Sequence, residues 1–563
     1  IMVLALTSDT LTKAQLYDSA DSVIQQQLSQ VDGVGQITLG GGALPSVRVE
    51  LQPGKLSSYG IGLEDVRAAL GAANADSAKG HIDQGDQRYE ILSNDQISKA
   101  APYRDLVIAY RAGAPVLLRD VAQVLDSNEN IRNAGLYNGK SAVLVIVYPM
   151  PGSNVVKTVQ QIQARLPSIE AALPGAIHVN VAIDRSESVR ASVSDTSRTL
   201  FIAVLLVVGV VFVFLLSPRA TLIPAVALPL SIIGTFGPMY LLGYNIDNLS
   251  LMALTIGTGF VVDDAVVVLE NIVRHLEAGL EPREAALRGS AEVGFTVISM
   301  SLSLIAVFLP ILLMPGIVGL LFHEFAVTLS IAILFSLLVS LTITPTMCAY
   351  VLGRQHGKHS QGRVARWFDA QFARFRNAYS RSLDAVLDHA LLTGLLLIVL
   401  IVLNVFLFRL LPATFFPEQD TGILIGPIVA DQSISFPNME KKLAQLQSIV
   451  RQDPDVASVA GFTGGRALNS ATVFIELKPL AARHLSATGV VNRLRPKLNA
   501  VSGARLFLQA QQDLQIGGRQ AAAEYQYTLT SDDANALFTG VPKLVTELGK
   551  YGGKLLDVNS DLQ

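Results

Sequence analysis

Six long apolar runs occupy the middle of the chain, with more polar regions on both sides. Each run is close to or above the ~20 residues that a helix needs to cross a bilayer. The runs are 198–216, 222–242, 249–270, 294–314, 324–351 and 390–411. Pro224, Pro229 and Pro238 interrupt the second run, which neighbouring helices tolerate inside a membrane. The pattern therefore predicts a bundle of six membrane-spanning helices.

The flanking regions alternate strand-like and helix-like segments. Before the bundle these are Met2–Leu6, Thr12–Gln30, Val34–Leu39, Val47–Leu51, Ala142–Tyr148, Asn154–Leu173 and His178–Ile183. After it they are Gly422–Ile428, Met439–Arg451, Thr472–Leu477, Ser486–Asn499 and Arg505–Leu508. Short β-α-β units of this kind predict split ferredoxin-like subdomains. Residues 53–140, with the hairpin Ile108–Leu118, interrupt the first set and are predicted to be an inserted subdomain.

Basic residues are distributed asymmetrically over the loops between the runs. Loops 217–221, 271–293 and 352–389 contain Arg or Lys, whereas loops 243–248 and 315–323 contain neither. The positive-inside rule places the three basic loops in the cytoplasm. Regions 1–197 and 412–563 then lie on the opposite side, which is the periplasm in a bacterium with two membranes. Within the last basic loop, 361–378 is predicted to be an amphipathic helix. It lies either on the membrane surface or against the inner end of the bundle.

Composition agrees with a membrane protein that carries large polar domains. Of 563 residues, 50% are hydrophobic and only 16% are charged, with a formal net charge of −3. The single Cys348 excludes an intrachain disulfide. His356 and His359 provide two ligands at most, too few for a closed metal site. We expect no metal or cofactor, and nothing in the sequence indicates nucleic-acid binding or hydrolysis.

Two adjacent carboxylates, Asp263 and Asp264, lie in the middle of the third run. A charge at that depth is unfavourable by about 2.5–3.5 kcal/mol. Consecutive residues on a helix point ~100° apart, so both can face a bundle interior on either side of its centre. The six runs contain no Lys or Arg in their interiors, since Arg198 and Arg409 lie at run ends. Either a cation comes from elsewhere or the pair holds protons.

These residues also allow three other interpretations. A buried salt bridge could merely fix helix packing. An intramembrane aspartyl protease requires two carboxyls that converge on one water, but neighbouring positions diverge and no second run has an interior Asp. The glycines of Gly257-Thr258-Gly259 favour close helix packing over a phosphate loop. Because intramembrane carboxylates more often mark ion or proton pathways, a proton site is favoured over an enzyme.

The segment Gly257–Gly316 resembles the signature of resistance-nodulation-division (RND) multidrug efflux pumps. The double Asp, the ENI-R-H motif after it and the VFLP sequence carry this resemblance. FFPEQDTG at Phe415–Gly422 fits the same family. DQSISF at Asp431–Phe436 and FTGGR at Phe462–Arg466 are most similar to its MdtB/MdtC-type subunits.

The resemblance implies twelve spans in two related halves, of which this chain holds the middle part. A weak repeat of Leu6–Asp9 at Leu529–Asp532 agrees with such a duplication. We therefore expect a fragment of a longer polypeptide. The implied fold is an α+β membrane protein with a helical bundle, periplasmic ferredoxin-like porter subdomains and a docking subdomain. The expected parts are 1–52 and 141–197 (porter and linker helix), 53–140 (docking), 198–352 (five spans), 353–389 (cytoplasmic loop), 390–411 (sixth span), 412–520 (second-half porter) and 521–563 (the next porter subdomain).

By resemblance, the chain would take part in drug/H+ antiport driven by the proton motive force in the Gram-negative inner membrane. Its partners would be other RND subunits in a homo- or heterotrimer, a periplasmic adaptor, an outer-membrane channel and small-molecule drugs. Asp263 and Asp264 would form a proton relay with a Lys of the second half, and a helix continuing from Arg185 would carry the movement. The family's glycine-rich switch loop matches Gly461–Leu468. That match makes Gly461, Phe462, Gly464, Gly465 and Arg466 candidate substrate-path residues, although Phe462 fits a hairpin core equally well.

Three alternatives keep the same fold or location. The first is transport of a metal, a lipid or a secretion substrate, although Met300, Met314 and Met347 are too scattered for a metal path. The second is a mainly structural or proton-conducting subunit of a mixed trimer. The third is a channel, which bulky β-α-β domains do not favour.

Overall fold

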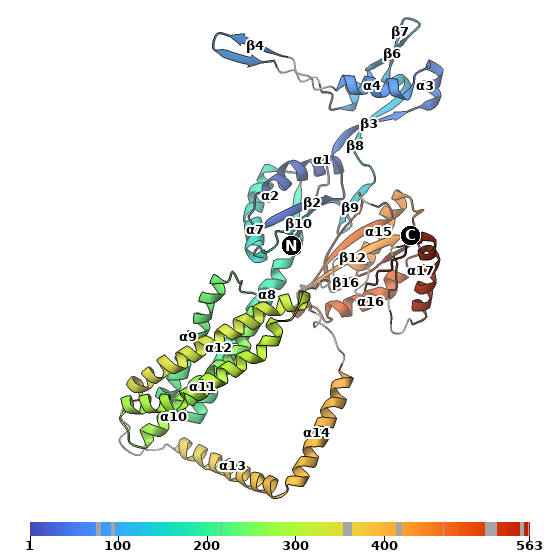
Figure 1. The fold of residues 1–563 in the computed structure, drawn as a ribbon. Helices are drawn as coiled ribbons and strands as arrows, with labels where there is room; N and C mark the ends of the chain where they lie inside the picture. The colour runs from blue at the N-terminus through green and yellow to red at the C-terminus, as the bar shows by residue number, and fades with distance from the viewer. Residues whose placement is uncertain are drawn as a thin grey trace. The chain divides into compact units, whose positions relative to one another are not determined.

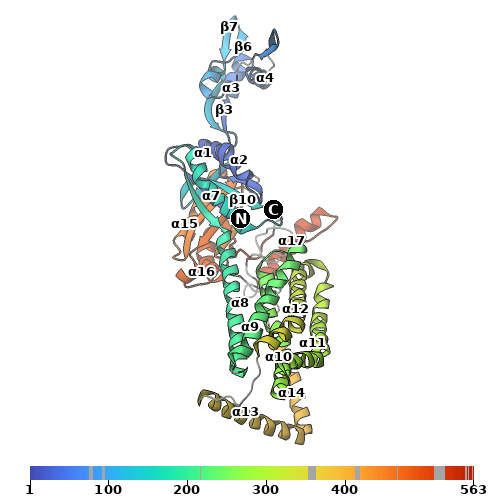
Figure 2. The same cartoon turned by 90° about the vertical axis from the view of Figure 1, so that its left-hand side faces the viewer.

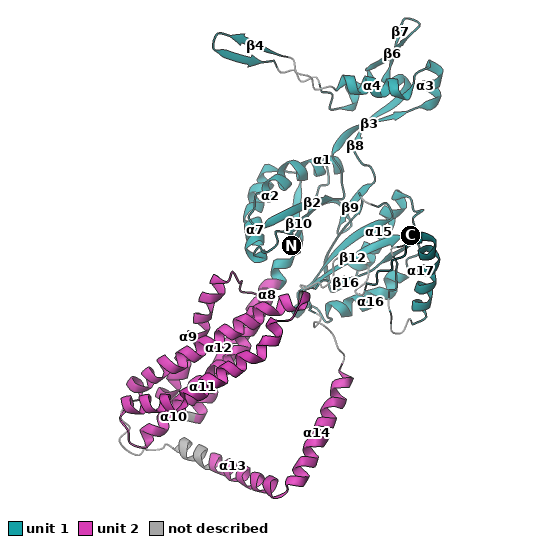
Figure 3. Cartoon of the chain, viewed as in Figure 1, with its two compact units in different colours: residues 1–188, 418–563 teal, residues 189–417 magenta. Residues whose placement is uncertain are grey.

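The computed structural model describes residues 1–74, 80–91, 96–215, 217–352, 363–411, 419–465, 467–512, 526–551, 555, 557–560 and 562. The chain forms two compact units, which Figure 3 draws in different colours. The first contains Ile1–Ser188 and Glu418–Gln563, and the second contains Val189–Pro417. The two polar flanks therefore fold together, and the apolar middle forms a unit of its own.

The first flank folds in the order β-α-β-β-β-α-β, with a long insertion between its second strand and its third (Figure 1). Its elements are β1 (Met2–Thr7), α1 (Lys13–Ser19), the π-helical segment η1 (Ala20–Gln25), α2 (Gln26–Ser29), β2 (Val34–Gly40), β9 (Asn133–Tyr137), β10 (Lys140–Pro149), α7 (Val155–Ala172) and β11 (His178–Asp184). The predicted helix Thr12–Gln30 is confirmed, with Thr12 as its N-cap and a π-helical turn in its middle. The hydrophobic faces of these helices pack on the strands, since Leu16, Ile24, Val145 and Ile162 are fully buried in one cluster.

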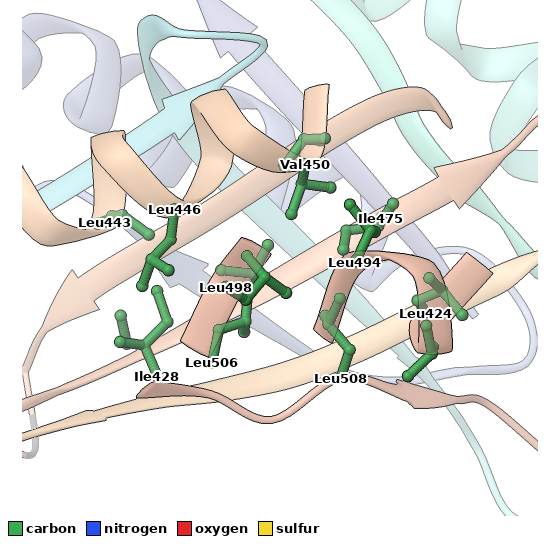
Figure 4. Close-up of a cluster of buried hydrophobic side chains, with 14 of the residues drawn as sticks. Leu424, Ile428, Leu443, Leu446, Val450, Ile475, Leu494, Leu498, Leu506 and Leu508 are labelled. Carbon is green, nitrogen blue, oxygen red and sulfur yellow. The ribbon is translucent and has the colours of Figure 1, made fainter. Parts of the chain in front are cut away.

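The second flank has a similar order, in which a β-α-β unit is followed by a strand, a helix and two short strands. Its elements are β12 (Ile423–Ala430), α15 (Phe436–Arg451), β13 (Val456–Gly464), β14 (Ser470–Leu477), η2 (Leu480–Ala482), α16 (Ala487–Asn499), β15 (Ala504–Leu506), β16 (Gln509–Ala510) and, further on, α17 (Ala534–Gly549). Figure 4 shows α15 and α16 placing Leu446, Val450 and Leu494 against Ile428 and Ile475 of the strands. Each such side chain contributes roughly 1.5–3 kcal/mol when it is fully buried.

One antiparallel sheet joins the two flanks. Its strand order is β11-β1-β10-β9-β13-β14-β12-β15, and the link between the flanks is the pairing of β9 with β13, where Tyr137 lies opposite Ala460. Strand β11 also packs against β13 and β14. Val3, Leu144 and Ile183 of the first flank consequently share a buried cluster with Ile423 and Ala460 of the second. The flanks are thus two halves of one folded unit.

The insertion in the first flank has a small core of its own. It contains β3 (Pro45–Leu51) paired with β8 (Ala122–Asn128), the hairpins β4 (His81–Gln84)–β5 (Gln87–Glu90) and β6 (Val107–Arg111)–β7 (Ala114–Leu117), and the helices α3 (Pro53–Tyr59), α4 (Leu63–Ala73), α5 (Ala100–Arg104) and α6 (Leu118–Val121). The predicted hairpin Ile108–Leu118 is confirmed by β6 and β7. The four helices were not predicted. They are short, and they contribute Leu56, Val66 and Leu118 to the buried cluster.

The second unit is helical. Its helices are α8 (Arg185–Leu215, which begins in the first unit), α9 (Pro218–Leu241), α10 (Asn248–Glu277), α11 (Pro282–Leu312), α12 (Gly316–Val351), α13 (Arg363–Asp388) and α14 (Ala390–Leu410). Among the described residues, six of these helices are long and apolar enough to span a membrane, which confirms the six predicted spans. Helix α11 begins earlier than its apolar run because its first turns carry polar residues such as Arg283 and Glu284. Figures 1 and 2 show α9, α10, α11 and α12 side by side, and α10 and α12 form the most extensive contact.

The predicted amphipathic helix in the loop 352–389 is confirmed as α13. The ring of Phe372 meets that of Phe214 at the end of α8 edge to face, with centroids 6.2 Å apart. Phe375 nevertheless remains 72% exposed. Helix α13 therefore touches the end of α8 and also presents aromatic surface, and its placement on a membrane surface stays a prediction.

Candidate functional site

Helix α10 carries both candidate carboxylates and is fixed at its ends by local bonds. At its start the carboxylate of Asp247 accepts a hydrogen bond of 2.8 Å from the backbone N–H of Ser250, and the Ser250 hydroxyl accepts one from the N–H of Asp247. This reciprocal capping box satisfies donors that the first turn of a helix leaves free. Farther along, a Cβ on Gly257 would lie 3.2 Å from Leu329 of α12. The expected packing role is confirmed for Gly257 but not for Gly259, which has nothing within 4 Å.

Asp264 faces the interior of the bundle. Its side chain is nearly fully buried, and its Oδ2 accepts a hydrogen bond of 3.0 Å from the hydroxyl of Ser301 on α11. One turn earlier on α10, the carbonyl oxygen of Val261 accepts a bond of 2.8 Å from the hydroxyl of Ser336 on α12. Hydroxyl groups from α11 and α12 therefore contact the turn of α10 that carries Asp264. Neutral hydroxyls compensate a buried carboxylate only in part.

Asp263 points away from that packed interior. It is exposed in the described structure, and no ion pair joins either carboxylate to a cation of the described residues. The prediction that both carboxylates face the bundle on either side of its centre is thus confirmed only for Asp264. For Asp263, the face that it occupies is uncovered by the described helices.

Both carboxylates open onto one cavity of about 490 Å³ between α10 and α11. The residues around it are Phe260, Asp263, Asp264, Ser299, Met300, Ser301, Ser303, Leu304 and Val307. Three serines and two carboxylates make its polar side, and the aromatic and aliphatic residues make the rest. Groups of this kind can hold water and pass protons, since hydroxyls both donate and accept.

The ENI-R-H motif has a structural role at the far end of α10. The carboxylate of Glu292 on α11 accepts hydrogen bonds from Asn271, Arg274 and His275 of that motif, at 3.2, 2.9 and 2.8 Å. Beside this cluster a Cβ on Gly289 would lie 3.0 Å from the Cα of Ile272. The motif therefore joins α10 to α11 where Gly289 allows a close approach of the helices, and the same two helices bring Asp264 and Ser301 together.

The candidate substrate-path residues lie in the first unit. Gly461, Phe462 and Gly464 belong to strand β13, so the expectation of a loop starting at Gly461 is wrong for these positions. Gly465 follows the strand, and Arg466 lies outside the described residues. The reason is pairing on both edges: β13 bonds to β9 on one side and to β14 on the other, which holds glycine-rich backbone extended.

Phe462 is packed between the two flanks. Its ring stacks on Phe474 of β14 with centroids 6.4 Å apart, and a Cβ on Gly40 of β2 would lie 2.9 Å from the same ring. The hairpin-core interpretation therefore describes its contacts here. A role in a substrate path stays a prediction.

Several residues of this site were not identified from the sequence. Ser301 and Ser336 are ordinary hydroxyls in apolar runs, and only the packing of three helices reveals their roles. Gly40 acquires its importance from Phe462, more than 400 residues away in the chain. Within the described part of the chain, no group of three His, Cys, Asp or Glu residues could hold a metal ion.

Comparison with known proteins agrees with this arrangement. Multidrug resistance protein MdtC of Yersinia pestis bv. Antiqua (strain Angola) is 52% identical over 563 residues, which are 100% of this chain and 55% of that protein. MdtC of Yersinia pseudotuberculosis serotype O:3 (strain YPIII) matches with the same identity and coverage. The chain thus spans about half the length of these curated relatives. Residues 1–563 also match the AcrB/AcrD/AcrF family, and the chain therefore belongs to that family.

Proposed function

We propose that the chain is the middle part of a proton-driven multidrug efflux pump, in which Asp263 and Asp264 bind the coupling protons. The observation that carries this proposal is the cavity between α10 and α11, onto which both carboxylates and the Ser301 hydroxyl open. The AcrB/AcrD/AcrF family, to which the chain belongs, is one of transporters rather than enzymes. Protons are the only coupling ligand that we propose, with no metal or cofactor.

The environment of Asp263 and Asp264 favours a change of protonation state over a permanent salt bridge that only fixes helix packing. Taking a carboxylate out of water is unfavourable unless a cation or several hydrogen bonds compensate it. Asp264 accepts a hydrogen bond from the neutral Ser301 hydroxyl, and the side of the site at Asp263 is open. We propose that a cation from the part of the pump beyond this chain closes that side when the pair is ionised. Protonation removes this attraction and allows the helices to shift between two arrangements.

Helix α8 is the proposed route from this switch to the polar unit. It runs without a break from Arg185, directly after strand β11, to Leu215. A rigid helix transmits a displacement along its axis, whereas a loop would absorb it. We propose that the two halves of the first unit, each with two helices packed on strands of the shared sheet, are ferredoxin-like porter subdomains on the periplasmic side. Their shared sheet would respond to the movement of α8, and the insertion from β3 to β8 would be the docking subdomain.

The charge of the loops and the names of the relatives support a location and an assembly for the pump. The basic loops support a bundle in the inner membrane of a Gram-negative cell, with both flanks in the periplasm. We propose that the complete subunit works as a homo- or heterotrimer with a periplasmic adaptor and an outer-membrane channel. The name of the relatives, multidrug resistance protein, supports amphiphilic drugs as substrates over metals or lipids.

The test uses the complete pump expressed in a drug-sensitive bacterium. Asp263→Asn and Asp264→Asn are each expected to abolish drug efflux while expression and trimer assembly stay normal. Glu277→Gln is the matched control, because Glu277 is an exposed carboxylate at the end of the same helix. Full efflux by either Asn variant would overturn the proposal.

A further inference from the structure

A second group of carboxyls lies in the polar unit. Glu476 is on β14, Asp184 ends β11, and Glu187 is in the first turn of α8. They come together because β11 packs against β13 and β14. The point where the chain leaves the sheet and enters α8 is therefore next to a carboxylate of the other flank.

Ser458 on β13 connects these parts. Its hydroxyl oxygen lies 3.0 Å from the carbonyl oxygen of Ala182 on β11 and 3.3 Å from Oε2 of Glu476. A hydroxyl has one proton and can donate it to only one of these acceptors. Both contacts are satisfied together only when Glu476 carries a proton and donates it to the Ser458 oxygen. Once Glu476 is ionised, Ser458 must choose between the two acceptors.

The surroundings of Glu476 favour its protonated form. Burial, with the Glu187 and Asp184 carboxylates nearby, raises the pKa of Glu476 to about 7. The Asp184 carboxylate accepts hydrogen bonds from the Gln163 amide and from the N–H of Ser186, at 2.8 and 2.7 Å. In the described part of the chain, Ser458 is the one hydrogen-bonding neighbour of the Glu476 carboxyl.

A further titratable group faces this cluster from β9. The Tyr137 phenol interacts with both Glu476 and Ser458, and the pKa of Tyr137 is raised by burial and by Glu476. Glu476, with its pKa raised to about 7, is the carboxyl of this cluster that changes charge near neutral pH.

We propose that Glu476, Ser458 and the Ala182 carbonyl form a proton-operated latch between the second-flank sheet and the strand that leads into α8. With Glu476 protonated, Ser458 donates to Ala182 and holds β11 on β13. With Glu476 ionised, Ser458 donates to the new carboxylate, the Ala182 carbonyl loses its partner, and Glu187 and Asp184 repel Glu476. Strand β11 is then held less tightly on β13 where the chain enters α8. The latch is separate from Asp263 and Asp264 and does not depend on the proposed proton relay.

The direction of the pH effect follows from the raised pKa. Glu476 would titrate at its ordinary value of 4.5 if it were free of these contacts, and at about 7 within them. The closed latch is therefore fully stabilised below pH 4.5 and loses that stabilisation as pH rises through about 7.

Hydrogen exchange of the whole polypeptide in detergent, followed by mass spectrometry, tests the latch. Peptides of β11 should be protected at about pH 5. At about pH 8 they should exchange about tenfold faster than the change in the intrinsic exchange rate between the two pH values alone predicts. The reason is that ionised Glu476 outnumbers protonated Glu476 by about tenfold one pH unit above its pKa. Glu476→Gln, a neutral isostere, should keep β11 protected at both pH values. Glu50→Gln, at an exposed position on β3, should behave like the wild type.

A second variant keeps the test decisive if Glu476→Gln fails to fold. Ser458→Ala removes the hydroxyl that joins the two acceptors, so β11 should exchange fast at both pH values, the opposite of Glu476→Gln. A pH dependence in Glu476→Gln equal to the wild type would overturn the latch. Wild-type protection of β11 in Ser458→Ala at acid pH would overturn it as well.

Discussion

The hydroxyl of Ser301 on α11 donates a hydrogen bond of 3.0 Å to the buried carboxylate of Asp264 on α10. This bond joins two helices that are also clamped by Glu292 and by the close approach of Gly289 to Ile272. A charge-bearing side chain is thereby held at a defined position inside an apolar bundle. A proton-binding carboxyl needs fixed hydrogen-bond partners, because these partners determine its affinity for the proton.

Loss of the Ser301 hydroxyl should impair transport. A hydrogen bond to a charged group contributes about 1.5–3 kcal/mol, so Ser301→Ala should lower drug efflux by about tenfold or more in cells with normal amounts of protein. Ser301→Thr keeps the hydroxyl and should retain most of the efflux. Equal efflux by the Ala variant and the wild type would show that the bond is dispensable.

Two glycines of α11 should respond differently to alanine. At Gly289 a Cβ would meet the backbone of Ile272 at 3.0 Å, so Gly289→Ala should separate α10 from α11 and destabilise the bundle by about 1–3 kcal/mol. At Gly294 nothing lies within 4 Å, and Gly294→Ala should be neutral or stabilise the helix by up to about 1 kcal/mol. Thermal unfolding in detergent measures both. Similar melting temperatures for the two variants would contradict the close approach.

Replacement of Gln447 on α15 by an apolar residue should stabilise the fold. Gln447 is nearly fully buried, and neither amide atom has a hydrogen-bond partner among the described residues. Its Nε2 lies over Gly461, where a Cβ would approach it to 2.5 Å. Because an unsatisfied buried amide is unfavourable, Gln447→Met should raise the free energy of unfolding by about 1 kcal/mol. Gln445→Met, at an exposed position on the same helix, should bring no gain. Destabilisation by Gln447→Met would show that the amide has a partner in solution.

Arg493 should protect the second flank from acid. Its guanidinium donates to Asp453 and Asp455, with contacts of 2.5 Å to each, and lowers the pKa of Asp455 below its ordinary 3.8. A lowered pKa contributes stability that is present above pH 3.8 and is lost as pH falls below it. In Arg493→Gln, loss of secondary structure followed by circular dichroism should therefore begin at higher pH. Arg505→Gln changes an exposed arginine on β15 and should leave the acid transition in place. An unchanged transition in Arg493→Gln would refute this role.

Features that leave a pattern in neighbouring residues could be predicted from the sequence, whereas features that depend on long-range packing could not. The spans were predictable because an apolar run of bilayer length is rare in a helix that does not cross a membrane. Strand β13 was missed because Gly461, Gly464 and Gly465 indicate a loop. Pairing on both edges keeps Gly461 in the strand, and Gly464 pairs with Asn133 of β9. Helices α3 to α6 were missed because each is short, and long-range burial of residues such as Leu118 stabilises them. The Asp263–Asp264 pair was visible at once, but its partner Ser301 depends on how two helices pack.

Proton flux through the assembled pump tests the central claim most directly. Reconstituted into liposomes with an imposed pH gradient, the wild-type pump should move protons across the membrane only while it transports drug. Asp264→Asn should abolish both the drug-dependent proton flux and drug transport, whereas Glu277→Gln should preserve both. Drug-coupled proton flux that persists in Asp264→Asn would contradict the assignment of this buried carboxylate as the proton-binding group.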